Sequence, residues 1–130
     1  MDNINIKWIT DGITPDAVEW AENFGKYLAS DNGVKPLTTN QLRKFFGEIK
    51  RIEAEGKCNI SELIMLKPLL AYSVGRDKGK TKIRDFAKQI TVGVETVIKA
   101  ESDDKRKSYF NNFVKIFEAI VAYHRYFGGE

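Results

Sequence analysis

Four closely spaced cations have the residue types and the spacing that could grip a phosphate backbone. They are Arg43, Lys44, Lys50 and Arg51. On a helix, the rotation per residue groups them at ~80–200° from the centre of an apolar stripe, around the small residues Gly47 and Ala54. The acids Glu48 and Glu55 fall farther round, at ~220–240°. We expect this flank to approach phosphates closely; the alternative is a solvated face with ion pairs such as Lys44 with Glu48.

A second basic cluster lies in a glycine-marked stretch, residues 76–84, which carries five cations and one acid. The candidate contacts here are Arg76, Lys78 and Lys82, joined by Lys67 beside a proline. Such a loop can follow a nucleic-acid backbone, or it can simply be a charged loop. Aromatic residues are not interleaved with these cations, so stacking on bases is not expected. We predict readout of backbone and shape rather than of base identity.

Few residues of the chain could catalyse a reaction or bind a metal ion. His124 is the only histidine and Cys58 the only cysteine, which excludes zinc sites built from several such ligands. A serine or cysteine triad would need His124, whose place near the end of a predicted helix is more typical of a packing or capping residue. No glycine pattern matches a phosphate-binding loop. Counting does not exclude a carboxylate-based hydrolase, but no spacing of the acids suggests one. We predict no catalytic residue, no metal and no cofactor.

The composition is that of one globular domain. The chain has 130 residues, of which 42% are hydrophobic and 30% charged, which excludes a disordered or low-complexity protein. We expect a single helical domain over residues 1–130. No apolar run reaches the ~18–20 residues of a membrane span, and the start of the chain has no signal-peptide pattern. A lone cysteine cannot form an internal disulfide. The expected location is the cytoplasm.

The net charge of +3 is unevenly distributed along the chain. Residues 1–37 carry three basic and six acidic side chains, whereas residues 38–88 carry twelve basic and six acidic ones. Residues 89–130 are balanced, with six of each. A basic central block is what phosphate backbones select, because neutralising phosphates releases counterions. The alternative is that these cations only solubilise helix surfaces.

Helical periodicity dominates after residue 13. We expect helices over residues 14–30, 38–55, 60–75, 81–100 and 104–127. Thr38 and Gln41 form a capping-box pattern at the start of the second, and Gly56 ends it. Pro68 should kink or restart the third, because its ring clashes with the preceding turn. The sequence therefore predicts an all-α bundle of about five helices.

The first 13 residues follow a different pattern. Ile4, Ile6 and Trp8 alternate with polar residues, which is the period of a strand. No second strand is available to pair with this segment. We therefore predict an extended N-terminal arm over residues 1–13, packed on the helical bundle of residues 14–130 or on a neighbouring molecule.

Three stretches of the chain resemble one known family. They are Leu37-Thr38-Thr39-Asn40-Gln41-Leu42-Arg43-Lys44-Phe45-Phe46, Leu66-Lys67-Pro68-Leu69-Leu70-Ala71-Tyr72-Ser73-Val74-Gly75-Arg76 and Phe117-Glu118-Ala119-Ile120-Val121-Ala122-Tyr123-His124-Arg125-Tyr126-Phe127-Gly128-Gly129. Their order and spacing resemble the small subunit of the type III-A CRISPR interference complex, the Csm complex. The resemblance covers residues 37–129.

The resemblance implies a small all-α subunit that is not itself a nuclease. Copies of it stack alongside the backbone subunits that hold the guide RNA, contact the duplex of guide and target RNA, and help to hold the target during antiviral defence. Cleavage of RNA and DNA belongs to other subunits. The implied partners are guide RNA, target RNA, the backbone and large subunits, and further copies of the chain, with no membrane. The cations inside the matching stretches are Arg43, Lys44, Lys67 and Arg76, whereas Lys50, Arg51, Lys78 and Lys82 come only from the helix and loop arguments.

Two other functions remain open at this point. A DNA-binding regulator would need a helix-turn-helix, and the link from Gly56 to Asn59 is short enough for one. The helix that follows is apolar, however, whereas a recognition helix needs base-reading polar residues. A small metal-dependent hydrolase would need several carboxylates to converge in the fold.

Overall fold

The computed structural model describes residues 2–130, and in that range it contains six helices and no β-strand. The helices are α1 (Lys7–Thr10), α2 (Pro15–Ala29), α3 (Thr39–Glu55), α4 (Ile60–Asp77), α5 (Ile83–Ile98) and α6 (Asp103–Tyr126). The predicted all-α bundle is confirmed. The five predicted helices correspond to α2–α6, and their bounds agree to within two residues.

Local capping chemistry explains this agreement. The Thr38 hydroxyl accepts a hydrogen bond from the Gln41 backbone N–H at 3.1 Å, and the Gln41 side-chain oxygen accepts one from the Thr38 N–H at 2.9 Å. The capping box predicted for this helix is therefore present. At the start of α4, the Asn59 side chain accepts a hydrogen bond from the Ser61 N–H at 2.9 Å. These interactions lie within a few residues of one another, so the sequence encodes them directly.

One sequence prediction about the backbone was wrong in detail, and one of the two outcomes predicted for Pro68, a restart of the helix, is excluded. Residues 7–10 form a short helix instead of continuing an extended arm, because Ile4 and Ile9 turn into the core while Ile6 remains 49% exposed. The alternating pattern therefore did not mark a strand. Pro68 does not restart its helix, since α4 continues from Ile60 to Asp77. Pro68 is exposed, so the carbonyl group that its missing N–H leaves unpaired can be solvated by water.

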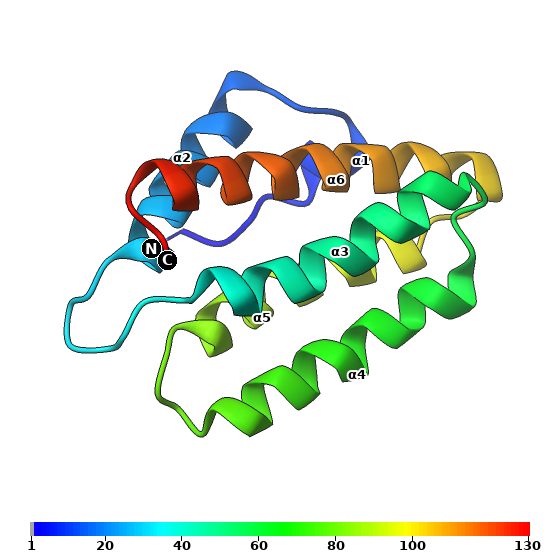
Figure 1. Ribbon diagram of the computed structural model, residues 1–130. Coiled ribbons are helices and arrows are strands. Elements are labelled where there is room, and N and C mark those ends of the chain that lie inside the picture. The colour runs from blue at the N-terminus through cyan, green and yellow to red at the C-terminus, as the bar shows by residue number, and fades with distance from the viewer. Residues whose placement is uncertain (1) are drawn as a thin grey trace.

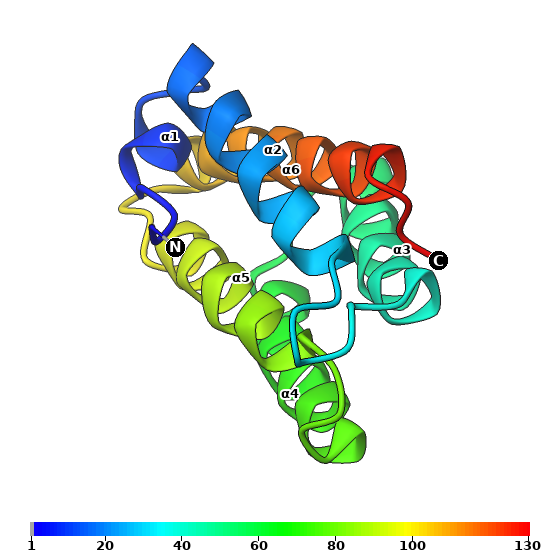
Figure 2. The same cartoon turned by 90° about the vertical axis from the view of Figure 1, so that its left-hand side faces the viewer.

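Helix α6 forms the centre of the bundle. It packs against α1, α2, α3 and α5, whereas α4 packs on α5 and α3. Figures 1 and 2 show that α2 and α4 lie at opposite edges of the bundle. None of the helices within residues 2–130 combines the length and the apolar character needed to cross a membrane.

Stacked and edge-on aromatic rings fill the interface between α3, α5 and α6. Phe117 of α6 is completely buried, and its ring centre lies 5.8 Å from that of Phe45 and 5.6 Å from that of Phe46. The Phe86 ring lies 5.7 Å and the Phe113 ring 6.2 Å from the same centre. This cluster holds α3 in place on α6, and it thereby sets the position of the basic residues on the outer side of α3.

Two glycines allow helices to approach closely. A Cβ atom at Gly25 of α2 would lie 2.8 Å from the His124 backbone nitrogen of α6. A Cβ atom at Gly93 of α5 would lie 2.5 Å from the Phe113 ring. Glycine at these two positions therefore permits contacts that a larger residue would block.

Candidate nucleic-acid interface

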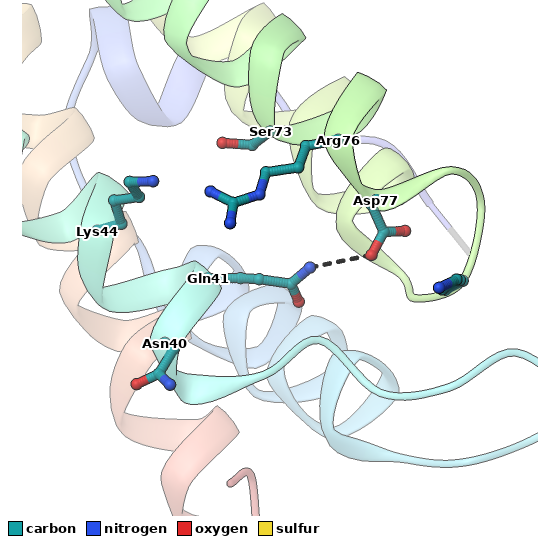
Figure 3. A pocket seen from close by; sticks show the side chains of 7 residues that line it. Asn40, Gln41, Lys44, Ser73, Arg76 and Asp77 are labelled. Carbon is teal, nitrogen blue, oxygen red and sulfur yellow. Dashed lines mark hydrogen bonds between the residues drawn. The ribbon is translucent and has the colours of Figure 1, made fainter.

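A basic cleft opens between the first turns of α3 and the last turns of α4. Its volume is about 400 Å³. The residues that line it are Asn40, Gln41, Lys44, Ser73, Arg76, Asp77 and Lys80. Two of the predicted contacts, Lys44 and Arg76, are thus brought together although 32 residues separate them. Figure 3 shows their side chains extending toward one another from the two helices.

Hydrogen bonds around Asp77 hold the two walls of the cleft together. The Gln41 side-chain amide donates to the Asp77 carboxylate at 3.1 Å (Figure 3). It also donates to the Thr81 hydroxyl at 3.1 Å. The Asp77 carboxylate also accepts from the Thr81 backbone N–H at 2.8 Å and from its hydroxyl at 2.9 Å. Because Gln41 belongs to the capping box of α3 as well, this residue couples the start of one helix to the end of the other.

The charge of Asp77 is already engaged in this network. Partial burial would raise the pKa of its carboxyl group, but the hydrogen bonds from Thr81 and Gln41 outweigh that effect and hold the pKa below its ordinary value. Asp77 is therefore ionised at neutral pH and bound to neutral donors. It forms no ion pair with Lys44, Arg76 or Lys80 in the structure.

The three cations of the cleft have no acid partner in the described part of the chain, residues 2–130. Lys44, Arg76 and Lys80 are exposed, and so are the two nearby cations Arg43 and Lys78. Like charges that converge without a counterion raise one another's electrostatic energy. An anion such as a phosphate group would remove that repulsion and accept hydrogen bonds from Lys44 and Arg76.

Lys80 is the cation of the cleft that was not among the contacts predicted from the sequence. It follows Lys78 and Gly79, which both have a left-handed backbone, with φ of 55° and 77°. Their conformation ends α4 and turns the chain so that Lys80 lines the cleft. A helix end followed by Lys-Gly-Lys is a recognisable signal for such a turn, and it could have favoured Lys80.

The second half of α3 has a different charge arrangement from the one predicted. Arg51 lies 2.9 Å from Glu48, 2.6 Å from Glu55 and 3.0 Å from Glu62, and its hydrogen bonds with Glu48 and Glu62 raise its pKa. Lys50 lies 2.6 Å from Glu53, and that hydrogen bond raises the pKa of its ammonium group. The expected separation of cations from acids on this helix was therefore wrong, because residues three and four apart reach one another along a helix.

Two further predicted contacts are used inside the fold. Lys67 of α4 pairs with Glu95 of α5 at 3.2 Å. Lys82 is 1% exposed, and its ammonium group donates to the backbone oxygens of Tyr27 at 2.7 Å and Ser30 at 2.5 Å. Burial lowers the pKa of Lys82. The charge of Lys82 thus satisfies carbonyl groups at the end of α2 and is turned away from the surface where an RNA contact was predicted.

Residues with catalytic potential lie outside the cleft. His124 is buried, and its Nε2 atom lies 2.7 Å from the Leu37 backbone oxygen. Cys58 is also buried, and burial raises the pKa of its thiol. Within residues 2–130, no group of three or more His, Cys, Asp and Glu side chains is placed to hold a metal ion.

Comparison with known proteins identifies a family. The family model described as Csm2 Type III-A matches residues 14–130. No significant match is found among curated proteins or among solved structures. The family match includes all three stretches on which the resemblance rested, and it extends toward the N-terminus to take in α2. The chain therefore belongs to the Csm2 family, the small subunits of the type III-A CRISPR complex.

Proposed function

We propose that this chain is a non-catalytic, cytoplasmic subunit that holds RNA in the Csm complex through backbone phosphates, and that the cleft between α3 and α4 is its grip. The observation that carries the proposal is the convergence of Lys44, Arg76 and Lys80 without an acid partner. The family match supports the assembly, and the geometry supports the surface. The RNA in question is the guide RNA and the target RNA paired to it.

The chemistry of the cleft suits a phosphate oxygen better than a base. Arg76 offers a planar set of donors and Lys44 a mobile point charge. Asn40 and Ser73 add neutral polar groups to the same wall, and no aromatic ring lines the cleft. Contacts of this kind position a nucleic acid without reading its sequence. We expect Arg43 and Lys78, which are exposed beside the cleft, to extend the grip along the strand.

Some of the cations predicted from the sequence as RNA contacts are left out of the proposed RNA surface. Lys50, Arg51 and Lys67 are held by carboxylates, so a phosphate would have to compete with an existing partner. The RNA surface is proposed to comprise Arg43, Lys44, Arg76, Lys78 and Lys80.

The DNA-binding alternative gains no support, because α4 presents exposed Ile64, Met65 and Tyr72 where a recognition helix needs polar residues.

Two double variants of the isolated chain test this assignment. Lys44→Ala/Arg76→Ala removes two cleft cations, and Lys50→Ala/Lys67→Ala removes two paired cations, so both lose the same net charge. Fluorescence anisotropy with a labelled single-stranded RNA between 50 and 200 mM salt should show that the cleft variant lowers the log–log salt slope by ~1.4, at ~0.7 per lost contact.

The paired-cation variant should keep the slope of the unmodified chain. This variant also leaves surface carboxylates without their cation. Their negative charge would weaken RNA binding by the control, so any error works against the proposal. Equal losses of slope in the two variants would show that RNA responds to net charge alone, and the cleft would no longer be the proposed site. A subunit that cleaves RNA in magnesium, with cleavage abolished by Asp85→Asn, would overturn the non-catalytic part.

A further inference from the structure

Helix α4 leaves an unusually apolar face uncovered. Of the nine exposed large hydrophobic side chains within residues 2–130, four lie on this helix. They are Ile60, Ile64, Met65 and Tyr72, with exposed fractions of 41%, 46%, 62% and 64%. Elsewhere on the helices such side chains occur singly, as with Val18 on α2, Val92 on α5 and Tyr126 on α6. Scattered single residues are ordinary, whereas a contiguous patch marks an interaction surface.

The whole outer face of α4 lacks charge. The exposed residues on it are Ile60, Ser61, Ile64, Met65, Pro68, Ala71, Tyr72 and Gly75, which span ~140° of the helix circumference at 100° per residue. A helix that is apolar on all sides is ordinarily buried. Ser73 and Asp77 of the cleft lie ~150–170° from the centre of this face around the same helix, whereas Arg76 lies ~90° from it and borders the face.

A groove between α4 and α5 borders this face. Its volume is about 890 Å³, and no aromatic side chain lines it. Leu70, Ala71, Val74 and Ala87 contribute its apolar floor, and Arg84 and Lys88 stand on its α5 side. Those two cations are four residues apart, close to the start of α5, and form no ion pair within residues 2–130. Like charges at this spacing, near the positive end of a helix dipole, destabilise the isolated chain.

We propose that this surface, the outer face of α4 with the α4–α5 groove, docks an amphipathic helix of a different protein subunit. That helix presents a row of apolar side chains to α4 and carboxylates to Arg84 and Lys88. Apolar surface of this extent suits a helix laid in a groove. Tyr72 is the one ring on this described surface on which a base could stack, and the aliphatic side chains around it and in the groove offer RNA little.

A second copy of the chain fits this surface poorly. Within residues 2–130, only α4 offers a row of exposed apolar side chains, so a second copy would have to bring its own α4. Such a pairing would bring the Arg84 and Lys88 of one copy toward those of the other, and juxtaposed like charges are costly at an interface. The inference does not depend on RNA binding.

The test uses the complex assembled from all its subunits and guide RNA. Ala71→Arg places a charged, bulky side chain in the groove, and Val18→Arg makes the matched change at an exposed apolar site on α2. Because both positions are exposed, both variants should melt within a few degrees of the unmodified chain. We expect Ala71→Arg to reduce incorporation of the subunit into the complex by roughly tenfold or more, and Val18→Arg to leave it unchanged. RNA binding by the isolated Ala71→Arg chain should be unaffected.

Cross-linking then identifies the occupant. The photo-reactive residue p-benzoylphenylalanine at position 71 should cross-link to a helical segment of another subunit that carries acidic side chains. Arg84→Glu/Lys88→Glu, a second variant with exposed positions, should lower incorporation, and lysines replacing the cross-linked segment's acids should restore it. Normal incorporation of Ala71→Arg would overturn the inference. So would a cross-link to RNA or to another copy of this chain.

Discussion

The first half of α3 carries Arg43 and Lys44, and the second half carries Lys50 and Arg51 seven residues later. The two pairs consist of the same two residue types. In the structure the first pair is exposed and forms no ion pair within residues 2–130, whereas the second is held by acids. The difference arises because carboxylates follow the second pair along α3 and reach it from other helices. The number of cations in a segment therefore says less about nucleic-acid binding than the position of the acids around each one.

Removing the aromatic core under α3 should have the largest effect on stability. It should affect the basic pairs in both halves of α3 alike. Phe117→Ala leaves a cavity beneath Phe45 and Phe46, which costs ~3–5 kcal/mol of unfolding free energy. Chemical denaturation measures this loss. A variant that melts within a degree or two of the unmodified chain would show that the rings do not form the core, and the placement of both basic pairs would then be wrong.

The next largest effect on stability is expected from Lys82, the cation whose charge is used inside the fold. Lys82→Met keeps the volume of the side chain but removes the donor to the carbonyl oxygens of Tyr27 and Ser30. Leaving buried acceptors unpaired costs ~1–3 kcal/mol, so the variant should be less stable in a urea titration. RNA affinity below the melting temperature should not change. A stable Lys82→Met that has lost RNA affinity would place this residue on the RNA surface after all.

A smaller, pH-dependent effect probes the wall of the cleft. Hydrogen bonds hold the pKa of Asp77 below its ordinary value of 3.8, so the folded state binds this proton less tightly than the unfolded chain does. Ionised Asp77 therefore stabilises the fold above that ordinary value, and the contribution is lost as the pH falls through the lower, folded pKa. Asp77→Asn should cost ~0.5–1.5 kcal/mol at pH 7.

Melting curves of both proteins between pH 7 and pH 2 check this prediction. The difference in stability should stay constant at neutral pH and shrink in acid, because protonated Asp77 no longer contributes its charge. A difference that is independent of pH throughout would show that the carboxylate charge has no part in joining α3 to α4.

The sequence was sufficient for features that depend on neighbouring residues. The capping box of Thr38 and Gln41 and the cap at Asn59 involve residues within three positions of each other. For the same reason the five long helices and their bounds were predictable. Lys44 and Arg76 remain predicted RNA contacts, and their convergence in one cleft joins residues that are 32 positions apart, which neighbouring residues do not indicate.

Most of the failures involve partners that are distant in the chain, although the pairs of Arg51 with Glu48 and Glu55 are local to α3. Burial of Lys82 depends on the end of α2 reaching the start of α5, across 52 residues between Lys82 and Ser30. The pairing of Arg51 with Glu62 joins α3 to α4, and α1 forms because Ile9 finds room in the core. A periodic pattern or a charge count carries no information on such tertiary neighbours.

The comparison between the two halves of α3 also supplies the most direct test of the account. Arg43→Ala/Lys44→Ala and Lys50→Ala/Arg51→Ala each remove two positive charges from one helix, seven residues apart. The measurement is the salt dependence of single-stranded RNA binding for both variants. The first should lower the log–log slope by ~1.4 and the second should leave it unchanged, with a small loss of thermal stability from the broken ion pairs. A larger loss of slope from the second variant than from the first would contradict the account.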